Sequence, residues 1–326
     1  MKKQVIPIAV VLVVTACGGN TNGSTSPSAG AGLSAVAAIA GEIPDAVKGE
    51  APFQIATDAT YAPNEFINPD NGQIQGWDID LGNQICKVMG VACTFNNVTF
   101  DDIIAQLLAS TPSEVANGDK PRYQFSISSW SPTQAREKKG IDFIGYYKAG
   151  EAWIEKTNGP SISSAADMCG HTVAVESGTT EESDAWGFMG KQVGGTPISG
   201  DKDNCPAGKD ITVDSFATQT EANSALLSGR ADIGWLDQPV ADYQVKQSNG
   251  KFKLGGQPCS VSPYGIALVK GSPLEKPITD AVKYLIDNNY YKTTLQNWGV
   301  ADGAIASSDV SLNNNNSIGQ TCVPAY

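Results

Sequence analysis

Short strand-like runs alternate with helical patterns through the middle of the chain, and this alternation limits the possible folds more than any other feature. The strand-like runs cover residues 53–57, 125–128, 172–175, 231–236 and 264–269. The helical patterns place apolar residues three and four positions apart, at Leu81, Ile85, Val88 and Met89, at Ile103, Ile104, Leu107 and Leu108, and at Ile278, Ala281, Val282, Leu285 and Ile286. Strands that alternate with helices predict an α/β fold with mostly parallel sheets. In such sheets, ligands bind where the carboxyl ends of strands meet loops and helix N-termini.

The first 17 residues are typical of an export signal. Two lysines precede an apolar run from Val5 to Val14, which is about half the length of the roughly 20 residues that span a bilayer. We therefore expect residues 1–16 to be a signal peptide. The segment Val14-Thr-Ala-Cys17 resembles a bacterial lipobox, which implies an extracytoplasmic protein anchored to the membrane by a lipid on Cys17. The alternative is an ordinary cleaved signal in which this cysteine has no such role.

Six cysteines remain outside this signal: Cys86, Cys93, Cys169, Cys205, Cys259 and Cys322. An even number of cysteines in an exported chain predicts disulfides, although the count leaves the pairing open. The chain has no Cys-x-x-Cys motif and His171 is its only histidine, so a zinc site is not expected. We expect neither a metal nor a cofactor.

Both ends of the chain have a composition that disfavours a packed core. Residues 17–50 are rich in Gly, Ser, Thr, Asn and Ala, and such a segment cannot offset its ordering entropy. We expect a flexible tether there, with a weak helix at most over Leu33–Ala40. Residues 301–326 form a similarly polar C-terminal tail, which Cys322 could hold against the globular part.

The net charge argues against one class of partner. The chain has 22 Lys and Arg residues against 34 Asp and Glu residues, and its formal charge is −12. Such a surface repels the phosphate backbone, so no nucleic-acid partner is expected.

Polar residues that could bind a ligand follow four of the predicted strands. They are Asp58 and Tyr61 after the first strand, Ser129, Trp130, Ser131 and Arg136 after the second, Glu176, Thr180 and Glu181 after the third, and Asp237 after the fourth. Together they supply a guanidinium group, hydroxyl groups and an isolated acid. This set complements an α-carboxylate and an α-ammonium group.

Each residue type suits one part of such a ligand. Arg136 can hold a carboxylate with two parallel charge-assisted hydrogen bonds. Thr179 and Glu182 form a capping-box pattern, and the free N–H groups at that helix start suit an anion. Asp237 would hold the ammonium group.

Three aromatic residues could cover the side chain of the ligand: Tyr61, Phe100 and Trp130. They would add cation–π attraction if that side chain is basic. Each candidate residue also has an ordinary structural explanation, because a lone arginine is usually on the surface, a Gly-Thr-Thr-Glu stretch usually starts a helix, and aromatic residues usually belong to the core. The order and spacing of these residues favour the ligand site.

In this order the motifs resemble the family 3 periplasmic-type solute-binding proteins of polar amino-acid ABC transporters, especially the histidine-binding and the lysine/arginine/ornithine-binding members. The shared motifs, between Phe53 and Gly299, are Asp58-Ala-Thr-Tyr-Ala-Pro, Gly76-Trp-Asp-Ile-Asp-Leu, Ser128-Ser-Trp-Ser with Arg136, Val173-Ala-Val-Glu-Ser-Gly-Thr-Thr, Gly229-Arg-Ala-Asp and Tyr264-Gly-Ile-Ala. The resemblance implies two α/β lobes joined by a two-strand hinge, with the ligand in the cleft between them. Lobe I would comprise residues 51–148 and 265–300, and lobe II residues 149–264.

The resemblance also implies roles for individual residues. Arg136 and the main chain near Ser131 and Thr180 would bind the α-carboxylate of the ligand. Ser129 and Asp237 would bind its α-amino group.

Other residues would contact the side chain of the ligand or form a disulfide. By the same resemblance, Tyr61 and Phe100 would enclose the side chain and Asp58 would meet a basic tip. Cys86 and Cys93 match a small disulfide loop of the histidine-binding members.

Some residues depart from the family pattern. Trp130 replaces a smaller apolar residue, and Glu176 stands where the members that bind basic amino acids have an apolar contact. The other four cysteines are unusual, and we expect the pairs Cys169–Cys205 within lobe II and Cys259–Cys322 near the hinge.

The charges of the expected cleft do not balance. Arg136 would face the acids Asp58, Glu176, Glu181 and Asp237. A ligand with one carboxylate and one ammonium group would leave a surplus of buried negative charge, which is costly. We therefore expect a basic amino acid or a related zwitterion.

These observations predict a monomeric protein that binds an amino acid outside the cell and delivers it to an ABC transporter permease. One alternative is a sensor or receptor-type binding protein, and another is a dehydratase-like enzyme on the same fold. The sequence shows no nucleophile–base pair and His171 merely precedes a predicted strand, so we expect no catalysis. Glu65 is expected to make a structural hydrogen bond rather than to contact the ligand.

Overall fold

One eight-stranded sheet runs through the molecule, which the computed structural model describes over residues 32–109, 121–315 and 320–323. The strand order is β5-β1-β6-β11-β7-β10-β8-β9, and a separate small sheet has the order β2-β3-β4. The strands are β1 (Phe53–Thr57), β2 (Thr60–Tyr61), β3 (Glu65–Ile67), β4 (Ile74–Gln75), β5 (Cys93–Asn97), β6 (Phe125–Trp130), β7 (Ile141–Lys156), β8 (Thr172–Glu176), β9 (Thr212–Phe216), β10 (Ile233–Asp237) and β11 (Phe252–Val269).

Helices cover both faces of this sheet. The α-helices are α1 (Ala37–Glu42), α2 (Asp45–Lys48), α3 (Trp77–Met89), α4 (Phe100–Leu107), α6 (Gln134–Lys138), α7 (Thr180–Phe188), α8 (Gln219–Ser228), α9 (Gln238–Gln247), α10 (Glu275–Asp287) and α11 (Tyr290–Trp298). Short 3-10 helices are η1 (Ala165–Met168), η2 (Ala301–Gly303) and η3 (Ser307–Asp309).

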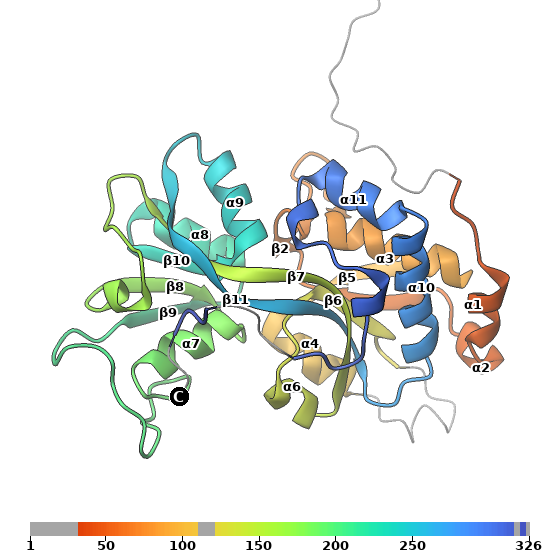
Figure 1. The fold of residues 1–326 in the computed structure, drawn as a ribbon, viewed down its shortest axis with the longest axis horizontal. Helices are drawn as coiled ribbons and strands as arrows, with labels where there is room; N and C mark the ends of the chain where they lie inside the picture. The colour runs from red at the N-terminus through yellow and green to blue at the C-terminus, as the bar shows by residue number, and fades with distance from the viewer. Residues whose placement is uncertain (1–31, 110–120, 316–319, 324–326) are drawn as a thin grey trace, which may run out of the picture.

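The sheet consists of two parallel parts joined by two long antiparallel strands (Figure 1). Strands β5, β1 and β6 are parallel in the part that we call lobe I, and β10, β8 and β9 are parallel in lobe II. Between them, β7 and β11 pair with each other and extend from one lobe into the other. This arrangement confirms the expected α/β fold with two lobes and a two-strand hinge. The expected lobe boundaries, after residues 148 and 264, fall inside these two strands.

Each lobe has its own hydrophobic core. In lobe I, α3 and α10 turn their predicted apolar faces inward, so that Leu81, Ile85 and Ile278 are fully buried. In lobe II, Val173 of β8 and Ile233 of β10 are fully buried in a second cluster. The two lobes are therefore separately packed bodies.

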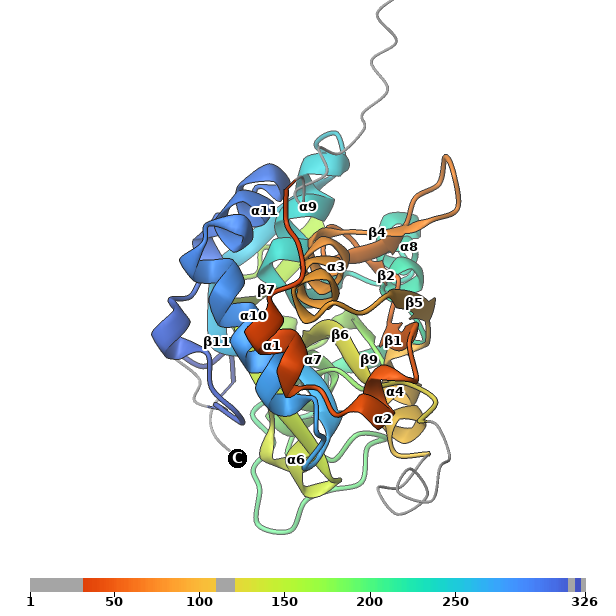
Figure 2. The ribbon, with the colours of Figure 1, turned by 90° about the vertical axis from the view of Figure 1, so that its right-hand side faces the viewer.

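The N-terminal tether is shorter than the sequence indicated, because residues 33–48 pack onto lobe I. Helix α1 lies against α3 and α10 (Figure 2). Ile39 and Ile43 are buried in the lobe I core, and the N–H of Val36 donates a 2.9 Å hydrogen bond to the carbonyl of Val88. The expected flexible tether is therefore corrected over this stretch: a few well-spaced apolar residues are enough when a neighbouring surface can cover them.

Part of the N-terminal prediction lies outside the described residues. This applies to the signal peptide 1–16 and to the lipidation site Cys17, which both stay predictions. In the part of the chain that the structure describes, no helix combines the length and apolar character needed to cross a membrane.

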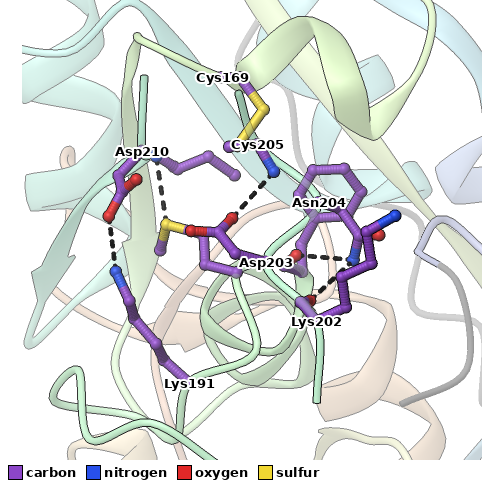
Figure 3. The surroundings of a disulfide bond; sticks show 10 residues. Cys169, Lys191, Lys202, Asp203, Asn204, Cys205 and Asp210 are labelled. Atoms are coloured by element: carbon purple, nitrogen blue, oxygen red, sulfur yellow. Dashed lines mark hydrogen bonds and ion pairs between the residues drawn. A yellow bond between two sulfur atoms is a disulfide. The ribbon is translucent and has the colours of Figure 1, made fainter. Parts of the chain in front are cut away.

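The structure contains the three disulfides that the sequence suggested: Cys86–Cys93, Cys169–Cys205 and Cys259–Cys322. The bond between Cys169 and Cys205 closes a loop region of lobe II (Figure 3). Beside it, the Cys205 N–H donates to Asp203 Oδ1 at 2.9 Å, and Lys191 forms a 2.6 Å ion pair with Asp210. These contacts hold the segment after α7 against the lobe without a helix or strand of its own.

The C-terminal tail contacts both lobes. Asn313 and Phe143 of β7 exchange two hydrogen bonds, from the Asn313 N–H to the Phe143 carbonyl at 2.7 Å and from the Phe143 N–H to Asn313 Oδ1 at 2.8 Å. Further along, Cys322 is bonded to Cys259 of β11 and is buried in the lobe II core. The described parts of the tail therefore contact both lobes, at β7 and at β11.

Candidate functional site

A small cavity lies between the lobes, at the carboxyl ends of β1 and β6 on one side and of β8 and β10 on the other. It is lined by Asp58, Tyr61, Glu65, Phe100, Ser128, Ser129, Ser131, Arg136, Glu176, Thr179, Thr180, Glu181 and Asp237. Ten of the eleven residues that the sequence suggested as ligand contacts belong to this set, and Trp130 is the exception.

Asp58 follows β1 and is held by the start of α4. Its Oδ2 accepts a 2.8 Å hydrogen bond from the Phe100 N–H, and its Oδ1 accepts one from the Thr60 hydroxyl at 2.6 Å. The side chain is buried, and this burial raises the pKa of Asp58. A ligand cation beside it would favour the ionised carboxylate.

Ser128 links the end of β6 to two acids. Its Oγ accepts a hydrogen bond from the Asp58 N–H at 2.9 Å and donates one to Glu65 Oε1 at 3.0 Å. Glu65 thus makes the structural hydrogen bond expected of it, and it also lines the cavity. Burial and the neighbouring Asp78 raise the pKa of Glu65 well above its ordinary value.

Ser129 has a left-handed φ of 51°, which is uncommon for a residue other than glycine. The buried Asp78 holds it there, because Asp78 Oδ2 accepts both the Ser129 N–H at 3.1 Å and the Tyr146 hydroxyl at 2.8 Å. Asn64 Nδ2 donates to Ser129 Oγ at 2.8 Å. Loss of hydration raises the pKa of Asp78 to about 7. This network fixes the serine at the cavity wall.

Arg136 brings the guanidinium group of the site from the short helix α6, whose N-cap is Thr133. Its Nη1 donates to the Ser131 carbonyl at 2.7 Å, and its Nη2 donates to the Gly178 carbonyl of lobe II at 2.8 Å. Burial lowers the pKa of Arg136 to about 10, so the group stays protonated at neutral pH. A guanidinium in this position can pair with a ligand carboxylate.

Trp130 does not line this cavity, and its expected ligand contact stays a prediction. The indole is 1% exposed and stacks on the Phe100 ring, with the ring centroids 4.1 Å apart. The guanidinium carbon of Arg136 lies 4.8 Å from the centroid of the indole. Trp130 is therefore behind two cavity residues, because the strand directs its side chain into the lobe I core rather than toward lobe II.

The start of α7 forms the lobe II wall. Thr179 Oγ1 accepts the Glu182 N–H at 3.2 Å, and Glu182 Oε2 accepts the Gly178 N–H at 2.8 Å. The expected capping pattern is present, with the return bond made to the residue before the N-cap. Such a helix N-terminus favours negative charge, and Thr180 in its first turn lines the cavity.

Glu176 ends β8 and faces the cavity from lobe II. Its Oε1 accepts the Gln219 N–H at the start of α8 at 3.0 Å, and the Thr60 hydroxyl of lobe I lies 3.5 Å from the same oxygen. Burial and the nearby Asp58 raise the pKa of Glu176 well above its ordinary value. Two acids from different lobes therefore flank the Thr60 hydroxyl.

Asp237 ends β10 and forms the other acidic part of the cavity. Its N–H donates to the Tyr61 hydroxyl at 2.9 Å, and burial raises the pKa of Asp237 to about 6. Burial and Asp237 raise the pKa of Glu181 well above its ordinary value. Glu181 Oε1 is buried and finds no hydrogen-bond partner among the described residues.

Hydrogen bonds between the lobes close the cavity. They join Arg136 to Gly178, Tyr61 to Asp237, and the Gln219 N–H to Thr60 Oγ1. The buried charges of this closed site comprise one guanidinium group and several carboxyl groups, which agrees with the surplus of acids read from the sequence.

Three cavity residues were not predicted as contacts: Glu65, Ser128 and Thr179. Ser128 and Thr179 are each adjacent to a predicted contact in the same motif, so both could have been predicted from the motifs. Glu65 gave no such signal, because it comes close to the site only through the hairpin of β2 and β3.

A two-lobed α/β molecule with a hinge of two strands, and with charged groups from both lobes around one buried cavity, is a solute-binding protein. The sequence profile of the bacterial extracellular solute-binding proteins, family 3, matches residues 53–301. The chain belongs to this family, as its motifs indicated.

Individual relatives agree with this assignment. The chain is 27% identical over 265 residues to the arginine-binding protein ArgT of Corynebacterium glutamicum, covering 81% of this chain and 79% of the relative. It is 30% identical over 232 residues to the lysine/arginine/ornithine-binding periplasmic protein of Escherichia coli, covering 69% and 74%. A solved ancestral arginine-binding protein bound to arginine is similar with a TM-score of 0.64 and 30% identity, covering 76% of this chain and 97% of that structure.

Proposed function

We propose that this protein binds a basic amino acid outside the cell and delivers it to the permease of an ABC transporter. The observation that carries the proposal is that Arg136 of lobe I and Asp237 of lobe II line one interlobe cavity. A guanidinium and a carboxylate so placed complement the two charged ends of an α-amino acid. Membership of the family and the arginine- and lysine-binding names of the relatives support this choice.

The proposed pose places the charged ends of the ligand on opposite walls. Arg136, the main chain at Ser131 and the helix start at Thr180 bind the α-carboxylate. Asp237 and Ser129 bind the α-ammonium group. All five residues line the cavity.

The remaining cavity residues select the side chain. Tyr61 and Phe100 enclose it, and Asp58 and Glu176 meet a cationic tip from the two lobes. Glu181 adds further negative charge. Burial raises the pKa of all three acids, so a positive ligand lowers the cost of ionising them.

Ligand binding then stabilises the closed arrangement, because the ligand contacts both lobes at once. Only the closed state brings the charged groups of both lobes into contact with the ligand. The protein acts as a monomer and needs no cofactor in this proposal. A lipid on Cys17 would keep it at the membrane beside the permease.

A sensor that passes its ligand to a receptor is the first alternative, and a pull-down of membrane partners separates it from transport. A dehydratase-like enzyme is the second alternative. His171 does not support catalysis, since it lies outside the cavity and pairs with Asp232 at 3.5 Å. The recovered ligand decides this point, because an enzyme would change it and a binding protein would return it unchanged.

A thermal-shift screen of the mature protein, without Cys17, against the amino acids tests the proposal. A ligand at 100 times its Kd should stabilise the protein by about 2.7 kcal/mol. We expect arginine, lysine or ornithine to give the largest shift. The absence of a shift with every α-amino acid would refute the proposed function.

Calorimetry on Arg136→Ala tests the position of the site. This change should reduce the binding free energy of the selected ligand by roughly 2–5 kcal/mol, which lowers its affinity about 30- to 4,000-fold. The reason is that the buried carboxylate of the ligand loses its partner. Arg230→Ala is the matched control, since Arg230 lies over Phe216 and is 61% exposed in its side chain. It should leave the affinity unchanged.

A further inference from the structure

The guanidinium group of Arg136 is held from behind by aromatic rings. Its central carbon lies 4.8 Å from the Trp130 centroid and 5.5 Å from the Phe100 centroid. The two rings stack on each other with their planes 21° apart. The guanidinium group therefore lies beside both rings, close enough to each for cation–π attraction.

Trp130 is itself firmly placed. Its Nε1 donates a 3.0 Å hydrogen bond to Ser126 Oγ, four residues back along the same strand. The centroid of the Phe143 ring lies 6.4 Å from that of the indole, and the indole is 1% exposed. The side chain has little freedom to follow a ligand.

The two rings differ in their access to the cavity. Phe100 and Arg136 both line it, whereas Trp130 does not. Any effect of Trp130 on binding must therefore pass through one of these neighbours. Phe100 can contact a ligand side chain directly, but the contact with Arg136 affects only the end of the ligand that this guanidinium binds.

We propose that Trp130 is a positioning residue, which fixes the plane of the Arg136 guanidinium for the carboxylate of the ligand. The inference rests on the proposed function. A guanidinium already held against a ring loses less side-chain freedom when it forms two parallel hydrogen bonds. The two carbonyl partners, Ser131 and Gly178, fix the same group from its edge, so ring and carbonyls together define its orientation.

The test compares ligands with and without a carboxylate. L-Arginine and agmatine share the guanidinium side chain and the amine, but agmatine lacks the α-carboxylate. Trp130→Leu should weaken arginine binding by up to about 12-fold, the upper range of the cost of ordering one side chain with many rotamers. The affinity for agmatine, measured by the same calorimetry, should change less than about twofold.

Two further variants separate positioning from packing. Trp153→Leu removes a tryptophan of lobe II that is also buried and contacts another ring, Trp235; it should lower stability and leave arginine binding as in wild type. In an Arg136→Ala background, Trp130→Leu should have no additional effect on affinity, because the group that it positions is gone. If Trp130→Leu does not fold, Trp130→Phe replaces it, with a loss of about threefold expected for arginine and none for agmatine.

The outcomes are distinct. Equal weakening of arginine and agmatine, or unchanged arginine affinity in a folded variant, would overturn the positioning role. A wild-type protein that binds no α-amino acid would refute the proposed function before any variant is made. If another amino acid is selected in the screen, that amino acid and its decarboxylated amine take the place of arginine and agmatine.

Discussion

The hydroxyl of Tyr61 accepts a 2.9 Å hydrogen bond from the main-chain N–H of Asp237, so a single contact joins β2 of lobe I to the end of β10 in lobe II. Tyr61→Phe removes this bond and keeps the ring. Because one hydrogen bond contributes about 0.5–1.5 kcal/mol, the closed state should lose that amount and ligand affinity should fall roughly 2- to 12-fold. Calorimetric titration measures the change.

Tyr291→Phe is the control for this variant. It removes another buried hydroxyl, which donates to the Tyr146 carbonyl at 2.9 Å within lobe I. This change should lower the free energy of unfolding without altering affinity. Equal losses of affinity in both variants would contradict a role of Tyr61 in closure.

Gly178 allows the lobes to approach each other. A Cβ atom at this position would lie 2.7 Å from Asp101 Oδ1 and 3.1 Å from Asp101 Cα. Gly178→Ala should therefore hinder closure and weaken ligand binding by about tenfold or more, since the second contact is with the main chain of lobe I. Small-angle scattering with saturating ligand should show a larger radius of gyration than for wild type.

Gly208→Ala controls for backbone strain in that experiment. Gly208 has a φ of +75°, close to the +80° of Gly178, but apart from its two chain neighbours no atom of the described residues lies within 4 Å of a Cβ built there. It should show the same loss of stability, on the order of 1 kcal/mol, with wild-type affinity. A Gly178→Ala protein that binds and closes as wild type would exclude the proposed interlobe contact.

Glu176 tests the preference for a positive side chain. Glu176→Gln keeps the shape of the residue and can still accept the hydrogen bond from the Gln219 N–H. At pH 8 the variant should bind arginine roughly tenfold more weakly, because the cation of the ligand side chain no longer gains an ionised partner. Its affinity for glutamine should change by less than about twofold. If both ligands respond alike, the charge argument fails.

The buried acids predict a pH dependence of the ligand-free protein. The pKa of Asp78 is raised to about 7, and the pKa of Glu65 is raised as well. The folded state therefore binds more protons than the unfolded state above the ordinary range of these acids, so stability should fall as the pH rises from 5 to 8. Urea unfolding at the two pH values measures this, and Asp78→Asn should show a smaller difference. Higher stability at pH 8 would have the wrong sign.

The disulfide of the tail should be the most stabilising of those that the structure describes. It links residues 63 positions apart, against 7 for Cys86–Cys93. Replacing Cys259 and Cys322 by alanine should cost up to about 4 kcal/mol of unfolding free energy, and the same change at the short loop about 2 kcal/mol. Urea titrations of the two variants test this order, and the reverse order would contradict the loop-length argument.

Much of the fold was readable from local patterns. The β1 run and the apolar faces of α3 and α10 were found, because each pattern is repeated within one element. The long strand β7 was missed and β11 was recognised only over its last residues, since their middle parts serve both lobes and follow neither pattern. The packing of residues 33–48 was missed for a different reason: it depends on a surface built by α3 and α10, far away in the sequence.

The site residues could be predicted from the sequence where they belong to recognisable motifs. Asp58, Arg136 and Asp237 follow strands whose ends meet, so their convergence could be expected. Trp130 lies behind the cavity wall because side chains alternate at the end of β6, which directs it into the lobe I core. Neighbouring serines then line the cavity while the tryptophan between them does not.

The attachment of the C-terminal tail to both lobes has a consequence for their motion. Asn313 is bonded to β7, and the Gln320 carbonyl accepts the Ser260 N–H of β11 at 2.8 Å. The seven peptide units between these points can span at most roughly 25 Å. The hinge strands can bend by small steps. A covalent segment of fixed length, however, limits how far the two lobes can move apart. Inserting or deleting residues in that segment would therefore change the maximum opening between the lobes before the hydrogen bonds of Asn313 and Gln320 break.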